Sequence, residues 1–170
     1  MNYNVINKSK IEIPGSLEFL NDDPEFVKLF IAITHTNYGF LCFTTPTIYG
    51  QEKISYLLKH RINGKKVVLW DGINQKEPIS PSFLADLFYP NLDANVFIMS
   101  NFQQCAKNAV NINEFLGMLN LNRDALFSHK KLIVFGMTNE FSKLITLKAP
   151  DFRSFFMASF HFDITEQKII

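Results

Sequence analysis

The sequence has few of the features that usually mark a metal-binding, membrane-spanning or nucleic-acid-binding protein. Its two cysteines, Cys42 and Cys105, lack metal-ligand spacing, and no apolar run approaches the ~20 residues that a membrane-spanning helix needs. Positive and negative residues nearly balance, with 17 Lys and Arg against 16 Asp and Glu and a pI of about 7.8. A nucleic-acid-binding domain would be expected to have a pI above about 9. We therefore expect no zinc centre, no membrane span and no direct contact with nucleic acid.

The histidines and the N-terminus add no further signal. The four histidines lie far apart from one another and from the cysteines, so the sequence predicts no metal site and no resident cofactor. The first residues lack the basic start and the apolar stretch of a signal peptide, and free thiols are typical of a reducing compartment. We expect a cytoplasmic protein.

What the sequence does contain is a large apolar fraction in a chain of domain size. Of the 170 residues, 47% are hydrophobic, and 18 phenylalanines stand against a single tryptophan, so the chain can bury a phenylalanine-rich core. We expect one α/β domain over residues 21–163, preceded by an N-terminal extension over residues 1–20 and followed by a tail over residues 164–170.

Short apolar runs alternate along the chain with segments of helical periodicity. Four runs are continuously apolar, as expected of strands buried on both faces, and a fifth alternates apolar and polar residues as an edge strand does. The expected strands cover residues 39–44, 67–70, 96–99, 132–135 and 156–162, with a short extended piece at 11–13. Helices are expected between the strands: Asp23 before Pro24 marks one start, Thr138 marks another, and a further helix is expected over 80–88. This order predicts a three-layer α/β sandwich with a mainly parallel sheet of about five strands.

The turn after the first apolar run has the spacing of a phosphate-binding loop but not its residues. In the pattern G-x-x-x-x-G-K-[ST], the glycines let backbone N–H groups face the phosphates, the lysine reaches them, and the hydroxyl holds Mg²⁺. Here Thr45 stands at the first glycine, Gly50 at the second, Gln51 at the lysine and Glu52 at the hydroxyl. We expect a loop over residues 45–50 that has kept the frame of a nucleotide site and lost its chemistry.

These replacements remove most of the affinity for a nucleotide. A carboxylate at Glu52 about 4 Å from a phosphate repels it by roughly 4 kcal/mol at an effective dielectric of about 20. Losing the charged hydrogen bond of the lysine costs about 1.5–3 kcal/mol more. The two effects together correspond to a loss of about 10⁴-fold or more in affinity.

A second position of the ATPase pattern is altered in the same way. In an intact enzyme, a buried strand ends in two carboxylates, of which one holds Mg²⁺ and the other activates water. The corresponding strand here, residues 96–99, ends in Ser100 and Asn101. Two degraded positions in the expected chain order favour a lost nucleotide site. The alternative is that residues 45–52 form an ordinary strand-to-helix turn of an unrelated fold.

The C-terminal half carries a longer pattern: LNLNRDAL over residues 119–126, an apolar strand over 132–135, APDFRSF over 149–155 and FHF over 160–162. It resembles the C-terminal half of a degenerate ATPase-like domain found in bacterial multidomain proteins, often ahead of tetratricopeptide repeats. The resemblance is clearest over residues 115–162, and an aromatic pair of the family is reduced here to Arg153 and Phe155. It implies a phosphate-loop NTPase-like sheet with the strand order of signalling ATPases, placed within a larger bacterial protein or complex.

The sequence therefore favours a catalytically inactive domain that serves protein–protein interaction or regulation. Its partner would be another protein, a neighbouring domain or a second copy of the chain. A role in signalling or anti-phage defence follows from the family analogy alone. As an alternative, the site binds a nucleotide-like small molecule, with Glu52 and Asp71 reading the base or ribose. A third hypothesis is an uncharacterised hydrolase that uses Asp71, Cys105 or Glu140.

Overall fold

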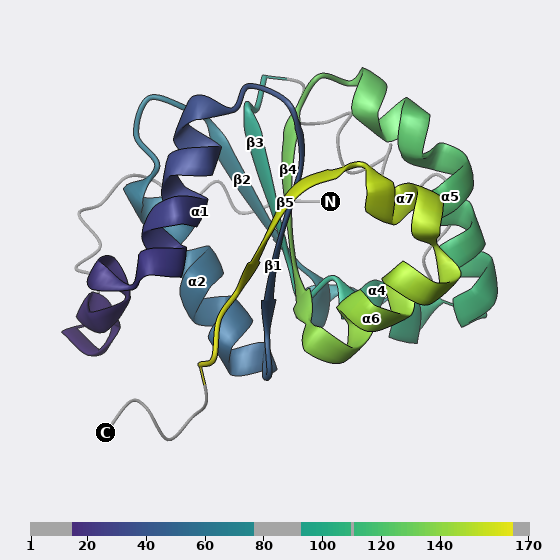
Figure 1. Ribbon diagram of the computed structural model, residues 1–170, viewed down its shortest axis with the longest axis horizontal. Coiled ribbons are helices and arrows are strands. Elements are labelled where there is room, and N and C mark those ends of the chain that lie inside the picture. The colour runs from purple at the N-terminus through teal and green to yellow at the C-terminus, as the bar shows by residue number, and fades with distance from the viewer. Residues whose placement is uncertain (1–14, 77–92, 110, 165–170) are drawn as a thin grey trace.

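The computed structural model describes residues 15–76, 93–109 and 111–164 (Figure 1), and the helix expected over 80–88 and the extended piece expected over 11–13 lie outside these residues. The strands are β1 (Gly39–Thr45), β2 (Val67–Asp71), β3 (Val96–Ser100), β4 (Leu132–Thr138) and β5 (Phe156–His161). The helices are the 3-10 helices η1 (Gly15–Asp22) and η2 (Gly72–Asn74) and the α-helices α1 (Pro24–His35), α2 (Ile48–Arg61), α4 (Gln103–Asn108), α5 (Ile112–Ser128), α6 (Asn139–Lys148) and α7 (Pro150–Ser154). Each of the five predicted strands begins at the predicted residue.

The five strands form one parallel sheet in the order β2-β3-β4-β1-β5. The predicted α/β class and the predicted parallel sheet of five strands are confirmed. β5 lies at an edge of the sheet, as its alternating pattern indicated. β2 lies at the other end of the strand order and is mostly half-buried, so the prediction that this apolar run is buried on both faces is wrong. The order differs from the two common doubly wound orders, 3-2-1-4-5-6 and 2-1-3-4-5, since β4 separates β1 from β3 here.

Helices cover both faces of the sheet, and an apolar core lies on each side (Figure 1). The core under η1, α1 and α2 includes Leu20, Leu29, Phe43, Leu57 and Val134. The core under α4, α5, α6 and α7 includes Phe102, Leu116, Phe135, Ile145 and Phe152. Among the helices described, none is both long and apolar enough to cross a membrane.

Phenylalanine rings fill the second core, as the composition predicted. The Phe135 ring lies edge-on to Phe40, Phe152 and Phe156, with ring centroids 5.4–5.5 Å apart. Such edge-to-face pairs are the arrangement that aromatic quadrupoles favour. These contacts join β1, β4, β5 and α7 and hold the centre of the sheet in place.

Two helix starts are set by the capping residues that the sequence marked. The Asp23 carboxylate accepts hydrogen bonds from the backbone N–H groups of Glu25 and Phe26, at 2.9 and 3.1 Å. The Thr138 hydroxyl accepts from the N–H of Phe141 at 3.3 Å. Both caps satisfy donors that the first helical turn leaves without partners.

The turn between β1 and α2 is shorter than the phosphate-loop spacing predicted. The hydroxyl of Thr47 accepts a hydrogen bond from the N–H of Gly50 at 3.3 Å, and α2 begins directly after this cap. Only Pro46 and Thr47 therefore link β1 to α2, so the predicted loop over residues 45–50 is wrong. Gly50 lies in the first turn of α2, where an added Cβ would meet the Cβ of Thr45 at 3.1 Å. Close packing of α2 on β1 accounts for this glycine.

Residues outside the predicted domain limits also belong to the packed body. Leu17 and Leu20 of η1 lie within the predicted extension over 1–20, and both are buried in the first core. Ile164 lies in the predicted tail and is buried in the same core. These contacts extend the packed body to residues 17–164.

Candidate functional site

The two positions that the sequence analysis compared with an ATPase pattern lie in direct contact at the carboxyl end of the sheet. Gln51, in the first turn of α2, accepts a hydrogen bond through its side-chain oxygen from the backbone N–H of Asn101, at 2.9 Å. Asn101 follows the last residue of β3, and both residues are fully buried. The residue that the sequence analysis placed at the lysine position and the residue it placed at the acidic strand end are therefore direct neighbours.

Asn101 is the centre of a network of side-chain amides. Its Nδ2 donates to Asp71 Oδ1 at 2.9 Å, and its Oδ1 accepts from Gln103 Nε2 at 3.4 Å. The Gln103 side-chain oxygen in turn accepts from the backbone N–H of Thr138 at 3.3 Å. We call these residues, Gln51, Asp71, Asn101, Gln103 and Thr138, the amide network. It joins the ends of β2, β3 and β4 to the first turn of α2.

The backbone around Asn101 is adapted to this network. Asn101 has a φ of 54°, in the left-handed region that asparagine adopts more readily than most residues. Opposite it, an added Cβ on Gly72 would lie 2.3 Å from the Asn101 carbonyl oxygen. Only glycine lets the end of β2 approach this closely. The contact between Asp71 and Asn101 therefore depends on Gly72.

Three buried polar atoms beside the network have no hydrogen-bond partner among the described residues: Gln51 Nε2, Ser55 Oγ and Ser100 Oγ. Ser55 lies one helical turn after Gln51, on the side of α2 that faces the sheet. Val96 and Ile98 of β3 face α2, and alternate residues of a strand lie on the same face. Ser100 therefore also lies on the side of β3 that faces α2. Buried atoms of this kind are commonly satisfied by a bound water molecule. The space between α2 and β3 is thus polar, although it is closed to bulk solvent.

The solvent-facing side of the network is acidic. Partial burial raises the pKa of the Glu52 carboxyl, the negative charge of Asp71 raises it further, and Lys53 lowers it. Lys53 lies beside Tyr49, with its Nζ 4.9 Å from the ring centroid. A phosphate group at this end of the sheet would face the carboxylates of Glu52 and Asp71.

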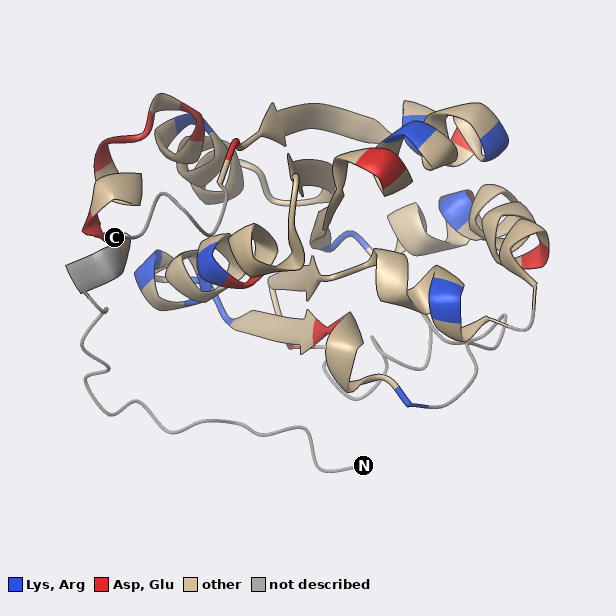
Figure 2. Ribbon diagram, turned by 90° about the horizontal axis from the view of Figure 1, so that it is seen from below, with Lys and Arg blue, Asp and Glu red and all other residues tan. Residues whose placement is uncertain are grey.

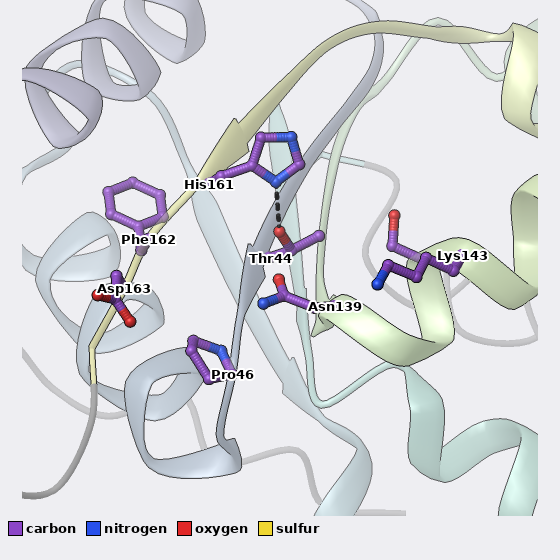
Figure 3. A pocket seen from close by; sticks show the side chains of 8 residues that line it. Thr44, Pro46, Asn139, Lys143, His161, Phe162 and Asp163 are labelled. Carbon is purple, nitrogen blue, oxygen red and sulfur yellow. Dashed lines mark hydrogen bonds between the residues drawn. The ribbon is translucent and has the colours of Figure 1, made fainter.

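A separate cavity of about 420 Å³ opens at the carboxyl ends of β1 and β5 (Figure 3). It is lined by Thr44, Pro46, Asn139, Ser142, Lys143, His161, Phe162 and Asp163. The Thr44 hydroxyl and His161 Nδ1 lie 2.7 Å apart and share a hydrogen bond. We call this cavity the β1–α6 pocket. The sequence analysis named Pro46 only as part of the predicted loop and His161 only among the scattered histidines, and it singled out no other lining residue as a candidate. Each lies at or just beyond a strand end or in the first turns of α6.

Comparison with known proteins finds a similar fold and no family. No known protein family matches this sequence, and no curated protein is similar to it in sequence. A chain in the crystal structure of Rif2 in complex with the C-terminal domain of Rap1 has a similar fold. The TM-score is 0.51 and the sequence identity 11%, over 88% of this chain and 58% of that chain. This chain thus spans less than two thirds of the length of its structural neighbour, and at this identity the likeness concerns the fold alone.

The remaining candidates of the sequence analysis lie apart from one another. Cys105 is buried in α4, and burial raises the pKa of its thiol well above the usual value. Burial likewise raises the pKa of Cys42 to about 12. A thiol held in its protonated form is a poor nucleophile. Glu140 is exposed in the first turn of α6, and within the described ranges no three His, Cys, Asp or Glu residues group closely enough to hold a metal ion.

Proposed function

We propose that this chain is a catalytically inactive domain of the phosphate-loop NTPase type that acts as a protein-interaction or regulatory scaffold in a bacterial complex. The observation that carries the proposal is the hydrogen bond between Gln51 and the backbone of Asn101. In a working site of this type, the lysine and the acidic strand end face each other across the phosphates and Mg²⁺. Here the two positions touch, both are buried, and both are neutral.

The strand order supports the ancestry part of this proposal. The resemblance to signalling ATPases implies a sheet in which an added strand separates the loop strand from the acidic strand. β4 occupies that place, between β1 and β3. The short turn of Pro46 and Thr47 is a departure from that pattern, because two residues cannot wrap around a phosphate chain.

The acidic charge beside the amide network opposes nucleotide binding, in addition to the shortness of the turn between β1 and α2. Glu52 and Asp71 lie close enough for the charge of Asp71 to raise the pKa of Glu52. A carboxylate about 4 Å from a phosphate costs roughly 4 kcal/mol at an effective dielectric of about 20. Gln51 supplies no positive charge in compensation.

A protein partner fits the surface better than a nucleic acid does. Large apolar side chains are exposed on separate helices, with Leu121 on α5 82% exposed and Leu147 on α6 76% exposed. Figure 2 shows Lys and Arg spread over several helices and interspersed with Asp and Glu. The structural neighbour is a protein–protein complex of Rif2 with Rap1, which is compatible with such a role.

The alternatives find less support in the geometry. For a sensor that reads a base or ribose with Asp71, the carboxylate would need free lone pairs. Its Oδ1 already accepts from Asn101 Nδ2 and from the N–H of Ile73, so Asp71 could offer such a ligand little more than Oδ2. For a hydrolase based on Cys105, the thiol would need exposure and a base, whereas it is buried in the second core.

Calorimetric titration of the full chain with ATP and with GTP, each in the presence of Mg²⁺, tests the nucleotide part of the proposal. We expect no binding in the micromolar range, and micromolar binding or measurable hydrolysis would contradict the proposal. The scaffold part is tested by purifying the tagged chain from its native cells at native levels after cross-linking. We expect a protein partner in stoichiometric amount and no nucleotide in an acid extract of the complex.

A further inference from the structure

The β1–α6 pocket lies where the connections of two neighbouring strands diverge. β1 and β4 are adjacent, and the helices that follow them pack on opposite faces: α2 contributes Ile54 and Leu57 to the first core, and α6 contributes Phe141 and Ile145 to the second. Ligands of open α/β sheets bind in the crevice at such a switch point, outside the carboxyl ends of the strands. The lining meets this description, with Thr44 and Pro46 from the end of β1 and Lys143 from α6.

The pocket is separate from the amide network. Its lining contains none of the residues that form the network, and it is bounded by β5 and the start of α6. Thr44 alternates with Phe43 along β1, and Phe43 belongs to the core under α2. Thr44 therefore faces the α6 side of the sheet, whereas Gln51 contacts Asn101 on the α2 side.

The side chains of the pocket present hydrogen-bond donors and one positive charge. Figure 3 shows Asn139 and Lys143 of α6 facing Thr44 and His161 across the cavity. Lys143 forms no ion pair with any residue that the structure describes. Thr44 is held against His161 Nδ1, which leaves Nε2 of the ring for another partner. In the tautomer whose Nδ1 accepts from the Thr44 hydroxyl, Nε2 carries the ring hydrogen and can donate it to an anion.

The remaining lining limits the charge and the character of a ligand. Pro46 adds an apolar residue to the wall, and the volume of about 420 Å³ falls in the range of small-molecule sites. Phe162 also belongs to the lining, but its ring packs on Phe43 in the first core. Asp163 adds a carboxylate to the same lining, which disfavours polyanions such as nucleoside triphosphates. A ligand with an apolar body and a single acidic group matches this combination.

We propose that the β1–α6 pocket binds a small organic anion, whose carboxylate or phosphate group contacts Lys143 and His161. The apolar body of the ligand lies against Pro46. This site is independent of the proposed loss of nucleotide binding, because it uses other residues on the other side of β1. The ligand would allow the scaffold to respond to a metabolite without any hydrolysis.

Four probes that share one ring and differ in the attached group test the proposal: benzoate, phenyl phosphate, benzamide and benzylamine. Each is titrated into the ¹⁵N-labelled full chain, and amide chemical shifts are followed. We expect saturable shifts at Asn139, Lys143 and His161 with benzoate, phenyl phosphate or both, much weaker shifts with benzamide, and none with benzylamine. The two anions distinguish a carboxylate ligand from a phosphate ligand.

Two matched variants of α6 decide whether the pocket is responsible. Lys143→Gln removes the cation of the pocket, and affinity for the anions should fall about 10-fold or more, as for the loss of a charged hydrogen bond. Lys148→Gln removes a cation of the same helix that lies outside the lining, and affinity should stay unchanged. Both lysines are exposed, so both variants are expected to fold. Equal affinity in Lys143→Gln and the parent, or no saturable shift with either anion, would overturn the proposal.

Discussion

The side-chain oxygen of Gln51 and the backbone N–H of Asn101 lie 2.9 Å apart in a hydrogen bond that solvent does not reach. The sequence analysis compared these positions with the lysine and the acidic strand end of a phosphate-loop enzyme. Their contact places both side chains in the protein interior. A buried polar group that loses its partner is destabilising, so the network contributes to stability as well as to closure.

The Gln51 hydrogen bond should be measurable in the free energy of unfolding. Gln51→Ala leaves the buried Asn101 N–H without its partner, and we expect the free energy of unfolding in urea to fall by about 1–3 kcal/mol. Ser55→Ala is the matched control on the same helix, because the Ser55 hydroxyl is buried without a partner among the described residues. Its effect should be smaller. Equal losses in the two variants would show that the hydrogen bond adds nothing beyond packing.

Gly72 should be far less tolerant of alanine than a glycine in open surroundings. The Cβ of Gly72→Ala would lie 2.3 Å from the Asn101 carbonyl oxygen, and overpacking of this kind typically costs about 1–3 kcal/mol. Gly117 lies inside α5 with nothing within 4 Å of an added Cβ. Gly117→Ala should therefore stabilise the protein by roughly 0.5–1 kcal/mol. Thermal unfolding of the two variants measures whether each substitution lowers or raises the stability of the protein. An unchanged stability in Gly72→Ala would contradict the close approach.

The buried Cys42 thiol predicts a loss of stability at alkaline pH. Its pKa is raised to about 12 in the folded protein, against about 8.5 for an unfolded thiol. Between these values the folded state binds the thiol proton and the unfolded state does not, so stability falls as pH rises through this range, by up to about 1.4 kcal/mol per pH unit. Unfolding by urea at about pH 8 and about pH 10 measures the slope. Cys42→Ala should give a flatter slope than the parent, and an identical slope would contradict the prediction.

The charge of Asp71 should be detectable at Glu52. Asp71→Asn removes the like charge while keeping an oxygen that accepts from Asn101, so the pKa of Glu52 should fall. It should stay above the usual value, because burial is the larger cause of the shift. Lys53→Met should raise the pKa of Glu52, since Lys53 lowers it. Titration of the Glu52 carboxyl carbon by NMR tests both directions, and an unchanged pKa in Asp71→Asn would show that the two groups are not coupled.

The positions of the strands could be predicted from the sequence, and so could some of the residues that form the amide network. Strands buried on both faces are continuous apolar runs, so their starts can be located without tertiary information. The spacing pattern marked Gln51 and a strand end marked Asn101, and the structure brings the two residues into contact. The length of the turn between β1 and α2 could not be predicted, because the Thr47 cap and the packing of Gly50 on Thr45 decide where α2 begins.

Features that depend on distant pairs escaped the sequence analysis. Gln103 lies in an unremarkable polar segment, and its role appears only when its side chain reaches the N–H of Thr138 on β4. The β1–α6 pocket depends on Thr44 and His161, which are 117 residues apart in the chain. No local pattern marks such a pair. The rule that strand ends of open α/β sheets carry functional groups is the signal that could have suggested it.

Introducing the lysine and hydroxyl of the phosphate-loop pattern should not produce nucleotide binding. The double variant Gln51→Lys with Glu52→Thr supplies the lysine and hydroxyl of the phosphate-loop pattern and removes one acidic charge. We nevertheless expect no micromolar binding of ATP with Mg²⁺ by calorimetry, because only Pro46 and Thr47 connect β1 to α2 and the acidic strand end is still Ser100 and Asn101. Gln51→Lys places a lysine at a fully buried position, so the circular dichroism of the double variant must match that of the parent, with the exposed Glu52→Thr alone as a second control. Micromolar binding by the folded double variant would mean that the side chains at 51 and 52, and not the geometry of the turn, prevent nucleotide binding in the parent.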